Sequence, residues 1–527
     1  MSYKKINLLD CTLRDGGYYN NWNFKHNLIK EYLILMSKLQ IKYIEFGFIS
    51  FTSKLNNTGN INRTLLKKLN FPKNLHIGVM INTKELFNKS KKTDKKKINI
   101  LFKKKLSNKI SFIRFACNVD ELNELCLILN DKRFNKFKIF INLMQASEIK
   151  NKDLIKIIKL IKINKIQYFY LADSFGSFTN SSIKKIYSLV IKNYNKNIGF
   201  HAHDNLGLAY SNTITLLKKG VNFIDCTLMG MGRGAGNLKT EEIYNYLYSE
   251  KNFDLIKKFN KKYFLPLKKK YNWGKNIYFR YAGINKIHPT YVQEIITNEK
   301  YKKKDYLKIL QYLKKNDTKK YDPFNLYNFN HFNNDNKFSL INITKYFKNK
   351  NIVVLGPSKI NPNIKSRISK LLMKNNHICV ALNSSNIIGE KFISYRVLSH
   401  PQRILSDMNY FIKNKTNKII PLALLKNKIV QKLSRNSKIL NYGLYVKKNV
   451  KHYVANNTFC TLEKPLAILY ILSILEISKI EKLLLVGFKG FENDNPFQDN
   501  TQEYLRLFKQ RNSKTLIKII GPSKYKL

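Results

Sequence analysis

Acidic residues are scarce in this 527-residue chain. Asp and Glu number 34 against 96 Lys and Arg, which gives a formal net charge of +62. Arginine is scarce too, with only 12 of the 96 basic residues, although proteins that read bases and phosphates favour its forked guanidinium. The lysines are spread along the chain, and Asn, Ile, Tyr and Phe, which share A/T-rich codons with Lys, are also abundant. We therefore attribute the charge to codon bias and do not expect a nucleic-acid partner, although the surface should attract anionic substrates.

Long hydrophobic runs are absent as well. No apolar run reaches the roughly 18 residues that a membrane span needs, and the start MSYKKINLLD lacks the apolar stretch of a secretory signal. We expect a cytoplasmic protein without membrane association. With 44% hydrophobic residues, the chain can build packed cores, and its length favours two or three domains.

Paired cysteine motifs are also missing. The sequence has no C-x-x-C, which excludes the usual spacing of a zinc finger and a short disulfide framework. We expect reduced, mostly buried thiols. The six residues are Cys11, Cys117, Cys126, Cys226, Cys379 and Cys460.

The first half of the chain alternates short apolar runs with longer stretches of helical spacing. Eight such runs over roughly 250 residues predict an N-terminal TIM (β/α)8 barrel, which we place at residues 1–295. The runs are INLLDCT (6–12), YIEFGFI (43–49), HIGVMI (76–81), ISFIRFA (110–116), KIFINLM (138–144), QYFYLAD (167–173), IGFHAHD (198–204) and FIDCTLMG (223–230).

Polar residues close many of these runs. In such a barrel the carboxyl ends of the strands form one rim, and the chemistry sits there. We therefore expect the functional site at this rim. The residues are Asp10 through Asp15 after the first run, Glu45 on the second, Arg114 on the fourth, Asp173 on the sixth, His201 and His203 on the seventh, and Asn237 in the glycine-rich loop after the eighth.

The rest of the chain has a different pattern. Residues 296–345 are polar and Asn-rich, and we interpret them as a linker. Residues 346–527 return to alternating strands and helices and predict a Rossmann-like doubly wound α/β domain of unknown role. This part lacks G-x-G-x-x-G and G-x-x-x-x-G-K-[ST], so its sequence assigns no nucleotide to it. Its expected strands lie in NIVVLGPSKI (351–360), HICVALN (377–383), KIIPLALL (418–425), ILNYGLYV (439–446), KLLLVGF (482–488) and LIKIIG (516–521).

The segment HAHDN at 201–205 carries two histidines two positions apart. Residues at i and i+2 of a strand point to one face, so both imidazoles can face the barrel mouth. Such a pair can be purely structural. Asp15, at the end of the first strand, lies close across the rim and would complete a mixed N/O site. That donor set suits Mn²⁺, Mg²⁺ or Zn²⁺ better than a soft metal.

Three motifs carry a resemblance to a known family. DCTLRDGG, HAHDNLGLAYSNT and GMGRGAGNLKTEE occur in order on the expected strands and loops. They resemble the motifs of the DRE-TIM metallolyase (HMG-CoA lyase-like) superfamily over about residues 5–295. Within it, the chain looks most similar to the 4-hydroxy-2-oxovalerate aldolases, because Asp173-Ser174-x-Gly176 resembles their D-S-x-G.

The resemblance implies a set of roles. Asp15, His201 and His203 would bind the metal, with Asn237 as a fourth ligand, and Arg14 would face the enolate oxygen. Ser174 would help to hold the substrate carboxylate. The implied function is a divalent-metal-dependent aldolase, a carbon–carbon lyase acting through a pyruvate-like 2-oxo-acid enolate, with an aldehyde or acyl compound as the second substrate.

The chain also departs from the family pattern. Tyr18 stands where the aldolases place a proton-transfer histidine, and with a pKa near about 10 tyrosine is a better acid than base. The lyase branch has a reactive cysteine in its glycine-rich loop, whereas MGMGRGAGN has none. His288 and Tyr291 are candidate replacements for the missing acid/base group, or simply a turn and helix start.

Two buried-strand charges have two interpretations each. Glu45 could bridge to Arg14 or be a core carboxylate, and Arg114 could bind a substrate carboxylate or form an internal ion pair. We count both with Ser174 as candidate substrate-binding residues. A Claisen-type acyl-CoA condensing enzyme or HMG-CoA lyase-like enzyme is the alternative activity. A non-catalytic, metal-stabilised scaffold that binds an anionic polymer is the alternative of another class. The sequence leaves the oligomeric state open and is compatible with a homo-oligomer.

Overall fold

The computed structural model divides the chain into two compact units, Met1–Tyr321 and Asp322–Leu527. The division falls inside the predicted linker 296–345. Two sequence expectations fall partly outside the described residues. Residues 1–5 belong to the start of the chain, where we expect no secretory signal, and residues 299–300, 317 and 334–339 belong to the predicted linker. The structure describes residues 6–51, 57–88, 90–164, 166–249, 252–298, 301–316, 318–333, 340–374, 376–425, 427–447, 453–490 and 496–527.

Eight parallel strands close the first unit into a barrel, in which each strand pairs with its sequence neighbours and β1 pairs with β8. Every predicted run overlaps one of them, so the expected barrel is confirmed. The strands are β1 (Asn7–Asp10), β2 (Tyr43–Phe48), β3 (His76–Asn82), β4 (Phe112–Cys117), β5 (Lys138–Leu143), β6 (Tyr168–Asp173), β7 (Asn197–Ala202) and β8 (Phe223–Cys226).

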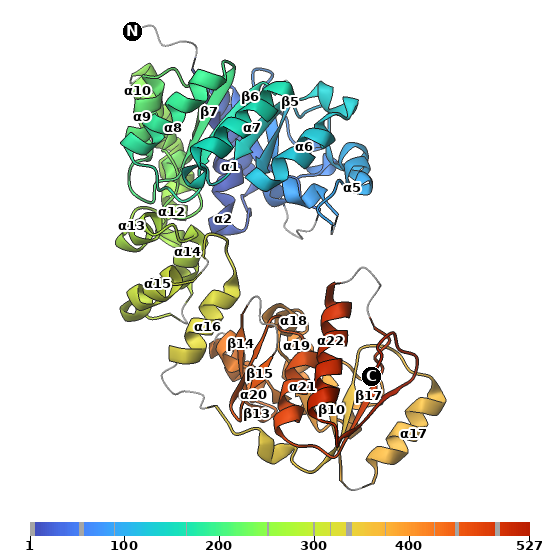
Figure 1. Ribbon diagram of the computed structural model, residues 1–527. Helices are drawn as coiled ribbons and strands as arrows, with labels where there is room; N and C mark the ends of the chain where they lie inside the picture. The colour runs from blue at the N-terminus through green and yellow to red at the C-terminus, as the bar shows by residue number, and fades with distance from the viewer. Residues whose placement is uncertain are drawn as a thin grey trace. The chain divides into compact units, whose positions relative to one another are not determined.

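Helices cover the outside of the barrel, as Figure 1 shows for α6, α7 and α8 around β5, β6 and β7. In α7 the residues Leu154, Ile157, Ile158 and Ile161 are buried, the spacing of one apolar helix face. The helices of this unit are α1 (Thr12–Asp15), α2 (Gly17–Asn20), α3 (His26–Lys38), α4 (Arg63–Lys67), α5 (Lys95–Ile100), α6 (Leu122–Leu129), α7 (Asn151–Ile163), α8 (Asn180–Asn193), α9 (Ala209–Leu217), α10 (Thr240–Tyr248), α11 (Phe253–Phe259), α12 (Leu265–Tyr271), α13 (Ile277–Ile284), α14 (Pro289–Thr297) and α15 (Tyr306–Lys314).

An aromatic layer fills the barrel interior below the rim. Phe112, Phe140 and Phe223 meet there with ring centroids 4.8 and 5.7 Å from Phe140. Two inward positions are glycines that leave room for these rings. A Cβ on Gly78 would lie 2.0 Å from Phe112, and one on Gly199 would lie 2.3 Å from Tyr170. The layer therefore closes the barrel beneath the polar residues of the rim.

The second unit contains a seven-stranded parallel sheet in the order β13-β12-β11-β10-β9-β17-β18, so the predicted parallel-sheet domain is confirmed. All six expected segments contribute strands. The three-residue β11 was not anticipated, because it is too short to show a pattern. The strands are β9 (Asn351–Leu355), β10 (His377–Leu382), β11 (Tyr395–Val397), β12 (Asn417–Ile419), β13 (Ile439–Leu440), β17 (Lys482–Val486) and β18 (Leu516–Ile520).

Both faces of this sheet are buried. On β9, Ile352 and Val354 face one apolar cluster, and Val353 and Leu355 face another, as the two-residue period of a strand requires. A small sheet of β14 (Gly443–Val446), β16 (Phe459–Leu462) and β15 (Val454–Ala455) adjoins the first cluster. The helices are α16 (Pro323–Asn333), α17 (Pro362–Leu372), α18 (Pro401–Ser406), α19 (Met408–Lys413), α20 (Asn427–Ser434), α21 (Ala467–Ile477) and α22 (Pro496–Arg511).

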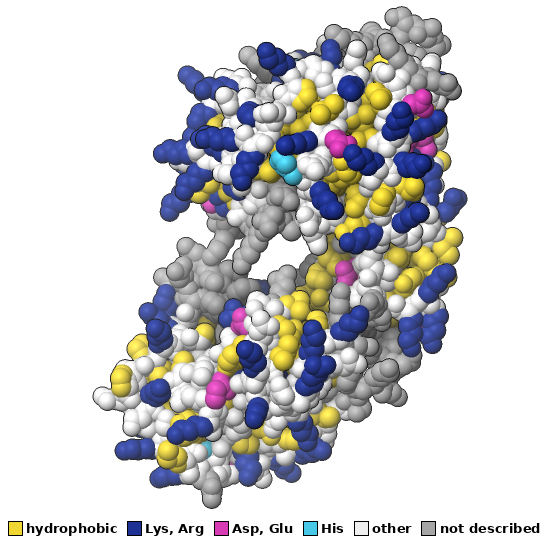
Figure 2. Space-filling model, turned by 180° about the vertical axis from the view of Figure 1, so that it is seen from behind, with side chains coloured by type: hydrophobic (Ala, Val, Ile, Leu, Met, Phe, Trp, Pro, Cys, Tyr) yellow, Lys and Arg dark blue, Asp and Glu magenta, His cyan; other side chains and the backbone are white. Residues whose placement is uncertain are grey.

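Three global expectations can be compared with the structure. All six cysteines are free and buried, as predicted. Among the described residues, no helix combines the length and apolarity required to cross a membrane. Figure 2 shows Lys and Arg side chains spread over the face in view, on both units, with few acidic side chains between them.

The aromatic layer predicts the effect of one substitution. Gly78→Ala should lower the free energy of unfolding of the first unit by about 1–3 kcal/mol, because the added methyl group has to displace the Phe112 ring. Both tryptophans, Trp22 and Trp273, lie in this unit, so fluorescence-monitored urea unfolding of the full chain measures it. In a Phe112→Leu background the same change should cost less. An equal cost in both backgrounds would contradict the packing argument.

Candidate functional site

The short turn after β1 places Arg14 and Asp15 at the rim. Asp10, at the end of β1, accepts hydrogen bonds from the Thr12 backbone N–H (2.9 Å), the Tyr32 hydroxyl (2.6 Å) and the Thr240 hydroxyl (2.7 Å). The turn carries α1, in which the N–H groups of Arg14 and Asp15 both bond to the Cys11 carbonyl. Asp10 therefore acts as the anchor of the turn.

The two glycines of DGG fit the same turn. A Cβ on Gly17 would lie 2.0 Å from the Trp22 ring, and the Trp22 indole N–H donates to the Arg14 carbonyl at 2.6 Å. The indole thus occupies the space that a side chain at 17 would need. This contact holds the backbone of Arg14 from the side opposite Asp10.

Strand β7 and the glycine-rich loop supply the other side of the site. His201 lies one residue before the end of β7, His203 follows the strand, and their rings meet edge to face with centroids 4.9 Å apart. His203 pairs with Asn237 in an isolated bridge. A Cβ on Gly232 would lie 2.5 Å from the Asn237 amide, so the loop folds tightly around that side chain. The glycines therefore bring Asn237 against the histidines.

These elements bring together the predicted metal ligands. Asp15, His201 and His203 are buried, and one potential ligand atom from each lies within 4.8 Å of the others. The Asn237 amide N–H donates to Asp15 Oδ2, while Asn237 Oδ1 and His203 Nδ1 are buried and have no hydrogen-bond partner in the described part of the chain. Unsatisfied buried acceptors beside a carboxylate fit a divalent cation. Burial raises the pKa of Asp15, but Arg14 and the two histidines outweigh it and lower that pKa overall, so the carboxylate is ionised.

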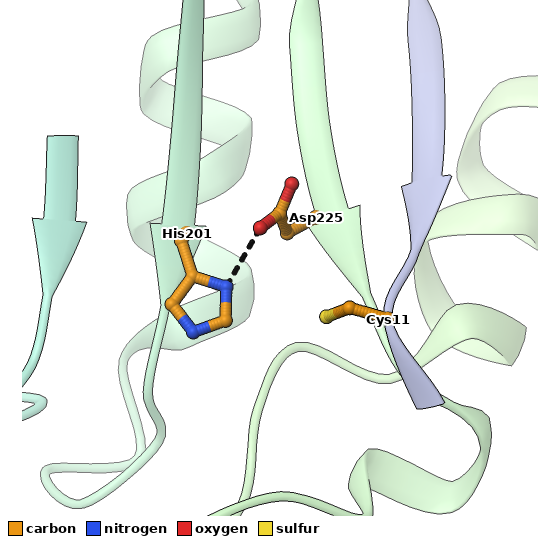
Figure 3. A group of neighbouring side chains, drawn as sticks. All are labelled: Cys11, His201 and Asp225. Carbon is orange, nitrogen blue, oxygen red and sulfur yellow. Dashed lines mark hydrogen bonds and ion pairs between the residues drawn. The ribbon is translucent and has the colours of Figure 1, made fainter. Parts of the chain in front are cut away.

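A second cluster shares His201. Figure 3 shows His201 on β7 joined to Asp225 on β8, with the Cys11 sulfur at the end of β1 nearby. His201 Nδ1 lies 2.8 Å from Asp225 Oδ2. Burial raises the pKa of the Cys11 thiol well above its usual value, which keeps it protonated and a poor ligand. Asp225 thus fits the role of an outer partner that orients His201 toward Asp15.

The charged side chains under the site form a closed ring. Arg14 donates to Glu45 at 2.6 Å and pairs with Asp15, while Arg114 pairs with Asp225 at 2.6 Å and lies 3.8 Å from Glu45. His201 closes the ring, because its two nitrogens face Asp225 and Asp15. Three carboxylates against two guanidinium groups leave one formal negative charge when the imidazole is neutral. A divalent cation would offset that charge.

The structure shows which contacts the candidate substrate-binding residues make. Glu45 bridges to Arg14, and Arg114 forms the internal ion pair and also donates to Asn142 Oδ1 at 2.9 Å. Ser174 Oγ accepts the Gln145 backbone N–H at 2.9 Å, which connects the loops after β5 and β6. Substrate contacts by these residues remain predictions.

Residues at the mouth of the site include Tyr18, Arg233 and His288. The Arg233 guanidinium lies 5.6 Å from the Tyr18 ring centroid. Burial raises the pKa of Tyr18 and lowers that of His288 well below its usual value. The positive charge of Arg233 lowers both pKa values, so it opposes the rise at Tyr18 and adds to the fall at His288. The Tyr291 hydroxyl instead donates to the Lys320 carbonyl. Of the two candidate replacements, His288 is the one whose pKa is also lowered by His203, a residue of the metal set.

Sequence reasoning missed Asp225 and Arg233. Asp225 lies in a run of buried residues, FIDC, and a carboxylate inside such a run was the available signal. Arg233 stands in GMGRGAGN, an arginine in a glycine-rich loop of a chain where Lys is the usual cation. Neither signal says which side chain the residue faces, because that depends on pairing between strands distant in sequence.

Comparison with known proteins agrees with these features. The HMGL-like family model matches residues 5–264. A 4-hydroxy-2-oxovalerate aldolase of Carboxydothermus hydrogenoformans is 35% identical over 99 residues, 19% of this chain and 30% of that protein. An oxaloacetate decarboxylase of Mycobacterium tuberculosis is 36% identical over 76 residues, 14% of this chain and 23% of that protein. The chain thus spans less than a third of the length of these two curated relatives.

One solved structure is similar over most of its own length. It is the N-terminal domain of a Bacteroides vulgatus protein that is described only provisionally as an aldolase. It is 32% identical, covers 55% of this chain and 97% of that chain, and has a TM-score of 0.48.

The two clusters predict different effects of substitution. Asp15→Asn and His203→Ala should each lower Mn²⁺ affinity by more than the roughly 10–100-fold typical of an outer partner, because each removes a ligand. Cys11→Ala should leave the affinity unchanged. Free Mn²⁺ measured by electron paramagnetic resonance during titration tests this. Loss of binding in Cys11→Ala, with retention in Asp15→Asn, would assign the metal to the other cluster.

Proposed function

Residues 5–264 form a domain of the HMGL-like family, and on this premise we propose that the chain is a divalent-metal-dependent aldolase that acts through the enolate of a 2-oxo acid. The observation that carries the proposal is the buried set Asp15, His201 and His203 with the Arg14 guanidinium beside it. The partial match to 4-hydroxy-2-oxovalerate aldolases supports the substrate class.

Asp15, His201, His203 and Asn237 would hold the cation. A divalent cation bound there supplies Lewis-acid stabilisation of the developing enolate oxygen. The mixed oxygen and nitrogen set admits Mn²⁺, Mg²⁺ or Zn²⁺ rather than a soft metal, and we propose Mn²⁺ or Mg²⁺.

Arg14 is suited to hold the enolate oxygen. Burial lowers the pKa of Arg14, but Asp15 and Glu45 outweigh it and raise that pKa, so the guanidinium stays charged. Nε donates to Glu45 and Nη1 to Asp15, while Nη2 is buried and finds no hydrogen-bond partner among the residues that the structure describes. A fixed donor aimed at growing negative charge lowers the barrier, because it needs no reorganisation during the reaction.

Tyr18 is the proposed proton-transfer group, and His288 is the proposed hydrogen-bond donor. His288 Nδ1 accepts the Thr290 backbone N–H at 3.4 Å, which leaves the ring proton on Nε2. A neutral imidazole is too weak an acid to give up that proton, so His288 donates only a hydrogen bond from it. The raised pKa keeps the Tyr18 phenol protonated, and the phenol gives its proton to the enolate carbon after the carbon–carbon bond breaks. In the reverse direction the phenolate takes the proton back, which is the step that exchange with solvent measures.

Arg233 is the proposed partner of the substrate carboxylate. Its Nε is buried and has no hydrogen-bond partner among the described residues, and its guanidinium lies next to Tyr18 at the mouth. A guanidinium matches a carboxylate with two parallel hydrogen bonds. We therefore assign the carboxylate of the 2-oxo acid to Arg233.

We also propose to class the second unit with the Rossmann-like doubly wound folds. The strand order runs outward from β9 to β13 on one side and from β17 to β18 on the other, and apolar clusters cover both faces. Chain order therefore reverses between β9 and β17, as in that class.

Proton exchange tests the proposed activity. With Mn²⁺ or Mg²⁺, the protein should exchange the methyl protons of pyruvate for deuterium in NMR spectra, and a chelator or the double change His201→Ala, His203→Ala should abolish the exchange. Tyr18→Phe should slow it about 100-fold while metal binding persists.

The same assay separates the alternatives. Exchange at the α-carbon of an acyl-CoA, with none at the 2-oxo acid, would identify the Claisen-type activity. Retained metal binding with no exchange of any 2-oxo acid or acyl-CoA would favour the scaffold.

The role of Arg233 predicts a separation of kinetic constants. Arg233→Gln should raise the KM for the 2-oxo acid by about 10–100-fold, with a smaller effect on kcat. That range is the loss of affinity that corresponds to the free energy of one charge-assisted hydrogen bond. Lys239→Gln, in the same loop but paired with Glu242, is the matched control and should leave KM unchanged. A fall in kcat alone would place Arg233 in the chemical step instead.

A further inference from the structure

A cavity of about 590 Å³ opens in the second unit, at the carboxyl ends of its parallel strands. Its lining includes Ser358 after β9, Asn383 after β10 and Phe488 after β17. Strands β9 and β17 are neighbours in the sheet, and the chain order reverses between them. In open parallel sheets, ligands bind in the crevice at this reversal.

Hydrogen bonds hold the walls of this cavity in place. Ser385 Oγ donates to the Gly356 carbonyl at 2.6 Å, and the Ser358 N–H donates to the Gly487 carbonyl at 3.0 Å. These bonds join the loops after β9, β10 and β17.

The Arg396 side chain on β11, fully buried, donates to the carbonyls of Asn383 and Ser385 at 2.9 Å each. A buried cation that serves two loop carbonyls keeps the loop after β10 in one conformation. The walls are thus preorganised, which lowers the entropic cost of binding.

The charged residues that line the cavity are all cationic. Lys359, Arg403 and Lys489 come from three separate loops or helices, and the described lining residues include no acidic side chain. Arg403 has a partial partner in Asp407, 3.5 Å away, whereas no ion pair is found for Lys359 or Lys489 among the described residues. The converging positive charge favours an anionic group such as phosphate.

The cavity also has an apolar surface. Ile387, Leu466, Ile468 and Phe488 line it, and Ile468 and Phe488 belong to the larger apolar cluster of the unit. A simple inorganic anion would leave this surface exposed to water. A ligand that carries both a phosphate and a flat, weakly polar ring would contact the cationic residues and the apolar ones together.

We propose that this cavity binds a nucleoside phosphate, with the phosphate at Lys359, Lys489 and Arg403 and the base over Phe488 and Ile468. The volume and the lack of a dinucleotide fingerprint favour a mononucleotide over a dinucleotide. The proposal does not depend on the chemistry of the barrel, because every lining residue belongs to the second unit.

Titration of the full chain tests the proposal. AMP, GMP, CMP, UMP and inorganic phosphate are titrated by isothermal calorimetry at 0.15 M KCl, which screens long-range attraction to the basic surface. At least one nucleotide should bind more tightly than phosphate. Lys359→Gln with Lys489→Gln should weaken it about tenfold or more. Both lysines are exposed, so the variant keeps its core.

Matched controls separate this site from general attraction to a basic protein. Lys365→Gln with Lys370→Gln removes two exposed lysines of α17 that do not line the cavity, and it should bind as the native chain does. His201→Ala with His203→Ala should also bind normally, even where it abolishes the barrel activity. Equal binding of phosphate and nucleotides, equal weakening in the α17 control, or loss in the histidine variant would each overturn the proposal.

Discussion

The buried ring of Arg14, Glu45, Arg114, Asp225 and His201 is the constraint on which the barrel site depends. Removing one partner of a buried ion pair costs about 3–5 kcal/mol, because the other charge is left without compensation. Five strands or strand ends contribute to the ring together with Asp15, so its members hold one another in position. The ring fixes the direction of Arg14 and His201 before any ligand arrives.

The surroundings of the ring keep it dry and rigid. Phe112, Phe140 and Phe223 close the barrel below, and the Arg114 guanidinium stacks 4.2 Å from the Tyr170 ring centroid. Asp10 and Trp22 hold the turn of Arg14 from two sides. In this low-polarity interior each charge interacts strongly with its neighbours. The ring is therefore well suited to set the ionisation of Asp15 and the orientation of His201.

The sequence predicted most of the fold, because strands buried on both sides appear as apolar runs that end in polar residues. The same logic placed Asp15, His201 and His203 on one rim, and the structure brings them together. It left open whether Arg114 binds a substrate carboxylate or forms an internal ion pair, and it could not identify Asp225 as the partner, since residues 111 positions apart meet only through barrel closure. The three-residue β11, with its buried Arg396, was also missed, although Arg396 shapes the second cavity.

One rule of parallel sheets accounts for the place of both candidate sites. Loops leave such a sheet at the carboxyl ends of its strands, so polar side chains gather there without disturbing the core. The closed barrel brings eight ends around one centre, which suits a metal set drawn from the first, seventh and eighth strands. In the open sheet the chain order reverses between β9 and β17, and loops that follow these strands line the cavity. The positions of the candidate metal site in the first unit and of the cavity in the second therefore follow from the same constraint applied to closed and open sheets.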